Sequence, residues 1–159
     1  MKYLVREMQP QEYPLLEEFL YEAIFQRDEN NLLPKTIIND PALQVYIKDF
    51  GTMNDDYCLC AEVNKEIVGA VWVRIIAGFG NLDDKTPEFA ISLYKNYRGH
   101  GIGTEMMRRM LELMKNKGYH RTSLAVQKDN YALHMYQKAG FQIVDESEEE
   151  YIMVHYLQS

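Results

Sequence analysis

The chain has 159 residues and a net charge of −7 at pH 7, and 47% of its residues are hydrophobic and 12% aromatic. This length fits one domain with a sizeable core, and the apolar content excludes an intrinsically disordered chain. The acidic balance disfavours nucleic acid and anionic membranes as partners, because both are bound through clustered Lys and Arg. We therefore expect a single domain over residues 1–159, with neither a nucleic-acid nor a membrane partner.

The N-terminal stretch MKYLVREMQPQEYP lacks the apolar segment of a secretory signal. The longest apolar run, IVGAVWV, is too short to span a bilayer. Cys58 and Cys60 lie two apart in an apolar segment, a spacing too wide for an easy disulfide within one strand. We expect reduced core thiols, although a redox pair or a metal site would use the same residues. Together these features predict a protein of the reducing cytoplasm.

In chain order, the first segment to show a pattern is YLVREM, which is typical of a short strand. Apolar residues at helical spacing predict a helix over residues 14–25, followed by a polar loop over residues 26–34. A second short helix is expected over residues 41–50, with Pro41 in its first turn. The acids Asp28 and Glu29 lie in the polar loop.

The rest of the chain alternates strand and helix signals. Asn64-Lys65 is a two-residue hairpin signal between two strands, and Gly118 and Gly140 mark the ends of two helices. The expected strands span residues 56–63, 66–77, 88–94, 120–126, 141–146 and 150–157, and the expected helices start at 102 and 131. Hairpins mixed with crossover helices predict an α/β layered domain with a mixed sheet.

A glycine-rich turn precedes the longest helix, in the stretch YRGHGIGTEMM. It lacks the Lys-Ser/Thr pair of a Walker A loop and the third glycine of a dinucleotide fingerprint. Arg98, Gly101 and Gly103 remain, with a strand before and a helix after. Exposed amides in such a turn favour an anion such as a pyrophosphate, because the helix dipole lies behind them. A tight strand–helix turn without a ligand is the alternative.

Two motifs at this separation resemble the GCN5-related N-acetyltransferase (GNAT) superfamily. The acetyl-coenzyme A signature Q/R-x-x-G-x-G/A is matched by Arg98, Gly101 and Gly103. NYALHMYQKAGF resembles the second cofactor motif N-x-x-A-x-x-x-Y-x-x-x-G-F, with the alanine one step off the commonest spacing. The resemblance covers roughly residues 57–157. It implies a single-domain GNAT-like α/β fold, whose mixed, mostly antiparallel sheet of about six or seven strands is flanked by about four helices.

The resemblance also implies a division of the chain and a set of cofactor contacts. Residues 57–159 would form the acetyl-CoA-binding core, and the helices and loops of residues 1–56 would face the acceptor. The co-substrate is acetyl-CoA, with no metal. The residues expected to contact it are Ile91, Ser92, Leu93, Arg98, Gly99, His100, Gly101, Ile102, Gly103, Thr104, Asn130 and Tyr136.

The chemistry that this resemblance implies is direct acetyl transfer to a primary amine. Tyr136 occupies the family's position for the general acid, although a core tyrosine packing beneath Phe141 is the alternative. Glu88 occupies the position of a base, although an exposed strand-end glutamate would look the same. If Glu88 is not the base, the fallback is water relayed to backbone carbonyls or to the Tyr57 and Tyr94 hydroxyls.

The acceptor carries no motif, so a small molecule, a polyamine and a peptide amine stay open. The run DESEEE is typical of a solvated hairpin end, but it and the acids of the polar loop would also attract a cationic acceptor. A homodimer is plausible for the family. A different class of function, a non-catalytic CoA-binding sensor of the same fold, also fits these motifs.

Overall fold

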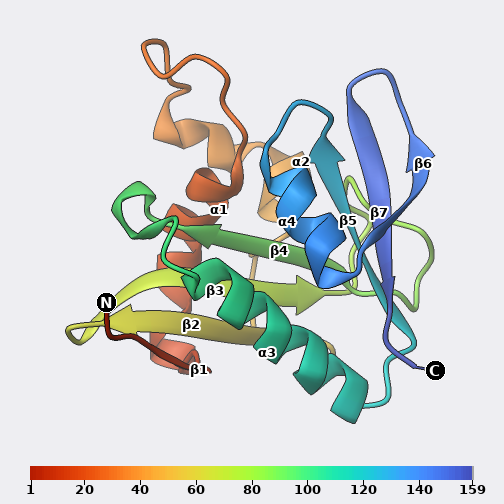
Figure 1. Ribbon diagram of the computed structural model, residues 1–159, viewed down its shortest axis with the longest axis horizontal. Helices are drawn as coiled ribbons and strands as arrows, with labels where there is room; N and C mark the ends of the chain where they lie inside the picture. Colours follow the sequence, from red (N-terminus) through yellow and green to blue (C-terminus); the bar gives the residue numbers. More distant parts are fainter. Residues whose placement is uncertain (159) are drawn as a thin grey trace.

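A seven-stranded sheet runs through the molecule in the order β1-β2-β3-β4-β5-β7-β6 (Figure 1). The computed structural model describes residues 1–158. All neighbouring strands are antiparallel except β4 and β5, which are parallel. The strands are β1 (Leu4–Glu7), β2 (Tyr57–Val63), β3 (Glu66–Arg74), β4 (Glu88–Leu93), β5 (Arg121–Gln127), β6 (Gln142–Glu146) and β7 (Glu150–Tyr156).

Four α-helices flank this sheet, and Figure 1 shows α3 and α4 in front of it and α1 behind. The helices are α1 (Leu16–Ala23), α2 (Pro41–Gln44), α3 (Ile102–Asn116) and α4 (Ala132–Ala139), with 3₁₀ turns η1 (Pro10–Leu15), η2 (Lys35–Asn39) and η3 (Lys95–Tyr97). This order of strands and α-helices confirms the predicted fold class. Among the described residues, no helix combines the length and apolar character needed to cross a membrane.

The two faces of the sheet bury two separate cores. On one face, Met106, Met110 and Met114 of α3 are fully buried against the central strands. On the other face, α1 packs Phe19 against Trp72 and the two cysteines, which are free thiols as expected. Burial raises the pKa of Cys60 to about 11, which keeps that thiol protonated near neutral pH.

The alternation of side chains along β4 divides its functional residues between the two faces. Phe89, Ile91 and Leu93 belong to the core under α3. By strand parity, Glu88 and Ser92 therefore point to the opposite face, where α1 lies. α3 and Glu88 therefore lie on opposite sides of the sheet.

The connection between β2 and β3 is the predicted hairpin. Asn64 and Lys65 have φ angles of 50° and 70°. Two consecutive left-handed residues are the geometry of the type I′ turn, whose twist matches that of the flanking strands.

The second predicted helix is much shorter than expected, because α2 ends at Gln44 rather than at residue 50. Three carbonyls of the following turns accept hydrogen bonds from two β3 side chains instead of continuing the helix. The Arg74 guanidinium donates to Val45 and Lys48, and the Trp72 indole donates to Tyr46 at 3.1 Å. The first predicted helix likewise begins as the 3₁₀ turn η1, and only residues 16–23 are α-helical.

The guanidinium that holds this segment also forms a buried ion pair. Arg74 Nε donates to Asp56 Oδ1 at 2.9 Å, and the two side chains are 2% and 0% exposed. Removing one partner of such a pair strands the other charge in the core.

We expect Asp56→Ala to lower the free energy of unfolding by about 3–5 kcal/mol, because Arg74 would stay buried without its counter-ion. Urea denaturation measures this loss. Arg108→Ala is the control, since it removes two exposed ion pairs on the helix surface, each worth at most about 1 kcal/mol. Equal losses in the two variants would contradict the assigned role of the buried pair.

Candidate active site

The candidate site lies where the sheet opens between β4 and β5. These two parallel strands share one register pair, Glu88 with Ser123, and then diverge. The Ser123 amide donates to the Pro87 carbonyl at 3.1 Å, which fixes the closed end of the opening. Beyond that point, no strand of residues 1–158 pairs with the β5-facing edge of β4.

Strand parity identifies which main-chain groups line this open edge. The Tyr94 amide donates to Val68 on β3, so the even-numbered residues of β4 direct their amides and carbonyls to β3. Ile91 and Leu93 therefore direct theirs to the opening. The Leu93 carbonyl accepts a hydrogen bond from Arg98 Nε at 3.1 Å. This leaves the Leu93 amide and both main-chain groups of Ile91 for a ligand.

Ser92 differs from its two neighbours, although the sequence grouped all three as cofactor contacts. Its main-chain groups face β3, and its hydroxyl donates to the Phe19 carbonyl of α1 at 2.7 Å. The structure thus places Ser92 as a link between α1 and β4, away from the open edge.

The glycine-rich turn lies at the end of this opening. Gly99 and Gly101 have φ angles of +82° and +83°, in the left-handed region, and a β-carbon at either position would meet no protein atom. Gly103 has an ordinary φ, and its β-carbon would be in van der Waals contact with Leu93 and Met135. The turn geometry therefore requires the first two glycines, whereas the third allows close packing of α3, β4 and α4.

The amides of this turn are available to an anion. α3 begins without a side-chain cap, and its first internal bond joins the Glu105 amide to the Gly101 carbonyl. Among the described residues, no backbone hydrogen bond uses the amides of residues 99–104. Ile102 is buried, and His100 and Thr104 are exposed. Unpaired amides at the positive end of a 15-residue helix form an anion site.

Arg98 differs from the glycines of the signature because both its amide and its side chain form hydrogen bonds within the protein. Its amide donates to the Lys95 carbonyl, and its guanidinium reaches Leu93 and Glu22 of α1, at 3.3 Å from the latter. The free amides therefore begin after Arg98. Its side chain ties the turn to β4 and α1.

The second motif borders the other side of the opening. The Asn130 side chain accepts a hydrogen bond from the Ala132 amide, the first of α4, at 2.9 Å. Gly140 ends α4 with a φ of +109°. The Tyr136 ring packs edge-on against Phe141 at 5.8 Å, and burial raises the pKa of Tyr136 to about 12. Its phenol is therefore protonated at neutral pH.

Glu88 is buried rather than exposed, which removes the strand-end alternative. Its side chain is 2% exposed, and neither carboxylate oxygen has a hydrogen-bond partner. Burial raises its pKa to about 7, and the nearby Tyr46 hydroxyl and Gly80 amide oppose this only in part. A carboxylate that titrates near neutrality is suited to accept a proton.

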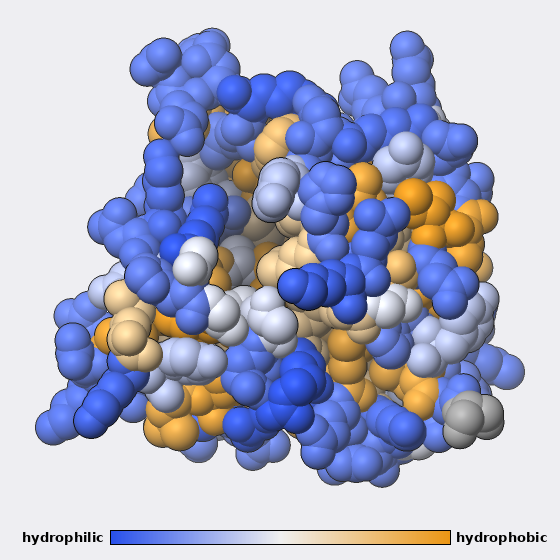
Figure 2. Space-filling model, viewed as in Figure 1, coloured by the Kyte–Doolittle hydropathy of each residue, from blue (hydrophilic) through white to orange (hydrophobic). Residues whose placement is uncertain are grey.

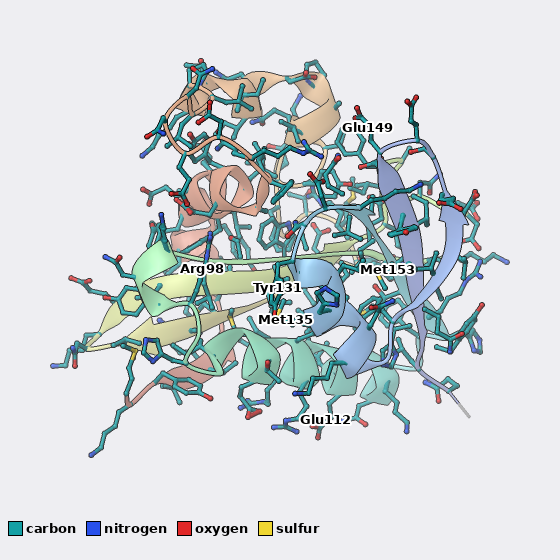
Figure 3. The ribbon with its side chains drawn as sticks, turned by 45° about the horizontal axis from the view of Figure 1, so that its top comes forward. Arg98, Glu112, Tyr131, Met135, Glu149 and Met153 are labelled. Atoms are coloured by element: carbon teal, nitrogen blue, oxygen red, sulfur yellow. The ribbon has the colours of Figure 1, made fainter. Side chains whose placement is uncertain are left out.

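Figures 2 and 3 show how these parts surround the opening. The surface is hollowed between the segment of residues 24–40 and the β5–α4 connection. The residues on the floor of this hollow are less polar than those on its rim (Figure 2). Arg98 lies at the β4 side of this hollow. Tyr131, which immediately precedes α4, and Met135 of α4 lie across from it (Figure 3). Tyr131 is 83% exposed, so the rim on this side carries an aromatic ring.

The model of the acetyltransferase (GNAT) family matches residues 12–141. The chain belongs to the GNAT family. It is 30% identical over 109 residues to Acetyltransferase ECA0875 of Pectobacterium atrosepticum, covering 67% of this chain and 71% of that one. It is 36% identical over 75 residues to the uncharacterized N-acetyltransferase YobR of Bacillus subtilis, covering 46% of this chain and only 28% of that one.

The fold of this GNAT protein is shared with solved structures. The PaiA N-acetyltransferase of Thermoplasma acidophilum, solved in complex with coenzyme A, superposes with a TM-score of 0.72 at 20% identity. The superposition covers 98% of this chain and 99% of that one. At this identity the likeness establishes the fold.

The two tyrosines named as a fallback for the base lie on different sides of the sheet in this GNAT protein. Tyr57 lies on the α3 side of the sheet, where its ring contacts Tyr119 at 6.2 Å and Lys117 at 5.6 Å. Glu88 points to the opposite face, so Tyr57 does not share its surroundings. The Tyr94 hydroxyl is on the α1 side but donates to Glu18 at 3.0 Å.

The acids proposed to attract a cationic acceptor are partly committed to other contacts. Glu29 pairs with Lys95 at 3.0 Å, and the Asp28 carboxylate accepts the Asn30 amide. In the DESEEE run, Glu146 pairs with Lys128 at 2.6 Å. Among the described residues, no cluster of three His, Cys, Asp or Glu side chains has a geometry that could hold a metal ion.

No sequence motif marks Tyr46, which lies beside Glu88. Its position follows from the turns after α2, which the sequence predicted to be helical. The position of Tyr46 depends on its hydrogen bonds with Trp72 of β3 and with Phe79 of the β3–β4 loop.

We expect Gly101→Ala to weaken acetyl-CoA binding by about tenfold or more, because a β-carbon in the left-handed region strains the turn and redirects its amides. Isothermal titration with CoA measures the change. Gly118→Ala is the matched control: Gly118 has a φ of +90° and open space beside it, but it lies at the far end of α3. The same loss of CoA affinity in both variants would remove the turn from the binding site.

Proposed function

We propose that this protein is an acetyl-CoA-dependent N-acetyltransferase that moves the acetyl group directly to a primary amine. The observation that carries this proposal is the open edge of β4 beside the uncapped start of α3. An extended pantetheine arm needs main-chain partners, and a pyrophosphate needs converging amides. The main-chain partners would come from the end of β4, and the converging amides would come from the start of α3.

The residues of the site fit acetyl-CoA as follows. The amides of residues 99–104 would hold the pyrophosphate, and Ile91 would pair with the pantetheine arm. The Asn130 amide nitrogen is available beside the same arm while its oxygen accepts the Ala132 amide. The Leu93 amide would donate to the thioester carbonyl, where negative charge develops as the amine attacks.

The transfer removes two protons from the amine nitrogen and adds one to sulfur. An alkylammonium has a pKa near 10, so it must lose its first proton before it attacks. Glu88 accepts this proton directly or through water, and the amine nitrogen bonds to the acetyl carbon. The carbon–sulfur bond then breaks, and the nitrogen loses its second proton to solvent, which leaves the neutral amide. Tyr136 donates its phenolic proton to the departing thiolate, which its raised pKa of about 12 permits because the phenol remains protonated.

The acceptor is a primary amine of a small molecule, a polyamine or a peptide in the cytoplasm. It would approach from the face of the sheet on which Glu88, α1 and the segment of residues 24–40 lie. This face carries the glutamates of α1, which favour a cationic acceptor.

The first test is acetyl transfer itself. Purified protein is mixed with acetyl-CoA and a panel of monoamines, polyamines and peptide amines, and the release of free thiol is followed. Release that depends on one amine class supports the proposal and identifies the acceptor. Tight CoA binding without release from any amine favours a non-catalytic CoA sensor, and absence of binding contradicts the assigned cofactor site.

We expect Tyr136→Phe to lower kcat by about 100-fold while CoA binding is retained, because the thiolate would lose its proton donor. Steady-state kinetics and CoA titration separate the two effects. Tyr156→Phe, which alters an exposed tyrosine of β7, is the control. Unchanged turnover in Tyr136→Phe would leave that ring with a packing role against Phe141.

A further inference from the structure

The buried Glu88 carboxylate lies close to Gly78 of the β3–β4 loop and to Tyr46 of the turns after α2. A β-carbon at Gly78 would lie 2.1 Å from Glu88 Oε2 and 2.6 Å from the Tyr46 hydroxyl oxygen. These two oxygens therefore flank the same point, and only a glycine at position 78 leaves room for both. Among the described residues, neither Glu88 oxygen has a hydrogen-bond partner, and the Gly80 amide is the other polar group that favours the ionised carboxylate.

Tyr46 is held in place on three sides. Its carbonyl accepts the Trp72 indole N–H at 3.1 Å, and its ring stacks on Phe79 with centroids 6.3 Å apart and planes 16° apart. Its hydroxyl oxygen accepts the Phe79 amide at 2.9 Å. Because this bond uses a lone pair, the hydroxyl proton remains free to donate to Glu88.

We propose that Tyr46 is a positioning residue for Glu88: its hydroxyl donates a hydrogen bond to the ionised carboxylate, orients it and lowers its affinity for a proton. The inference rests on the proposed function, in which Glu88 takes the proton of the amine. Hydrogen bonds of a base are often long in an unliganded enzyme and shorten when substrate is bound.

The other charged and polar side chains around Glu88 either form hydrogen bonds with different partners or, as carboxylates, cannot stabilise its ionised form. Arg74 is its cross-strand neighbour on β3, but that guanidinium is bonded to Asp56. Ser123, its partner on β5, donates its hydroxyl to the Gly80 carbonyl at 2.8 Å. Glu150 of β7 and Glu88 itself raise the pKa of Tyr46, as burial does, so the phenol stays protonated. Tyr46 is thus the side chain best placed to stabilise the ionised form of Glu88.

The direction of the effect of Tyr46→Phe follows from this arrangement. A hydrogen bond to the charged form of an acid lowers its pKa, so its removal raises the pKa of Glu88. The base form would then appear at higher pH. We expect the acid limb of the kcat profile to move up by about one pH unit, with about tenfold slower turnover at pH 6 and little change at pH 9.

The matched control is Tyr13→Phe. Tyr13 lies in the same N-terminal region and packs edge-on against Phe50 at 5.0 Å, away from Glu88. Tyr13→Phe should leave the acid limb of the kcat profile at the same pH. Thermal unfolding of both variants checks that each is folded. A loss of rate in Tyr46→Phe that is uniform across pH would show a structural role only and would overturn the inference.

Direct titration separates this inference from the proposed function. The carboxyl carbon of Glu88 is followed by NMR against pH in protein labelled at glutamate, with Glu88→Gln used to assign the signal. A higher midpoint in Tyr46→Phe supports the inference whether or not an acceptor amine is known, and an unchanged midpoint overturns it. Glu88→Gln that keeps both full turnover and the acid limb would instead refute Glu88 as the base, and this result is independent of the titration.

Discussion

The divergence of β4 and β5 after a single register pair is the constraint on which the site depends. Continued pairing would consume the main-chain groups of Ile91 and Leu93 and bury the open edge. The strands stay together at Glu88 because Ser123 and Thr122 both donate to the Pro87 carbonyl. α1 and α3 then cover the two faces of β4, so the strand keeps its shape without a neighbour along its open edge.

The segment after α2 depends on β3 in a similar way. Arg74 and Trp72 take the carbonyls that a longer helix would have used internally, and the buried Asp56 holds Arg74 in that position. Stopping the helix early allows Tyr46 to reach the β3–β4 loop. One buried ion pair thus stabilises the fold and also fixes the surroundings of Glu88, which lies directly across the strand from Arg74.

The order of elements, the hairpin and the faces of β4 could be predicted from the sequence because they follow from local signals and side-chain alternation. The cofactor motifs were recognisable because the amides of residues 99–104 come from one continuous segment. The length of α2, the hydroxyl bond of Ser92 and the place of Tyr46 were not predictable. Each depends on a partner at least 26 positions away in the chain, and no periodicity records such a pairing.

The burial of Glu88 makes the stability of the fold depend on pH. Its pKa is raised from the ordinary value of 4.5 to about 7, so the folded protein binds this proton more tightly than the unfolded chain does. The stability associated with the neutral acid is therefore fully present below pH 4.5 and is lost as the pH rises through 7. A glutamine at this position would avoid the loss, and an apolar residue would also suit the core. A group that ionises near neutrality in spite of this loss is characteristic of a site that moves protons.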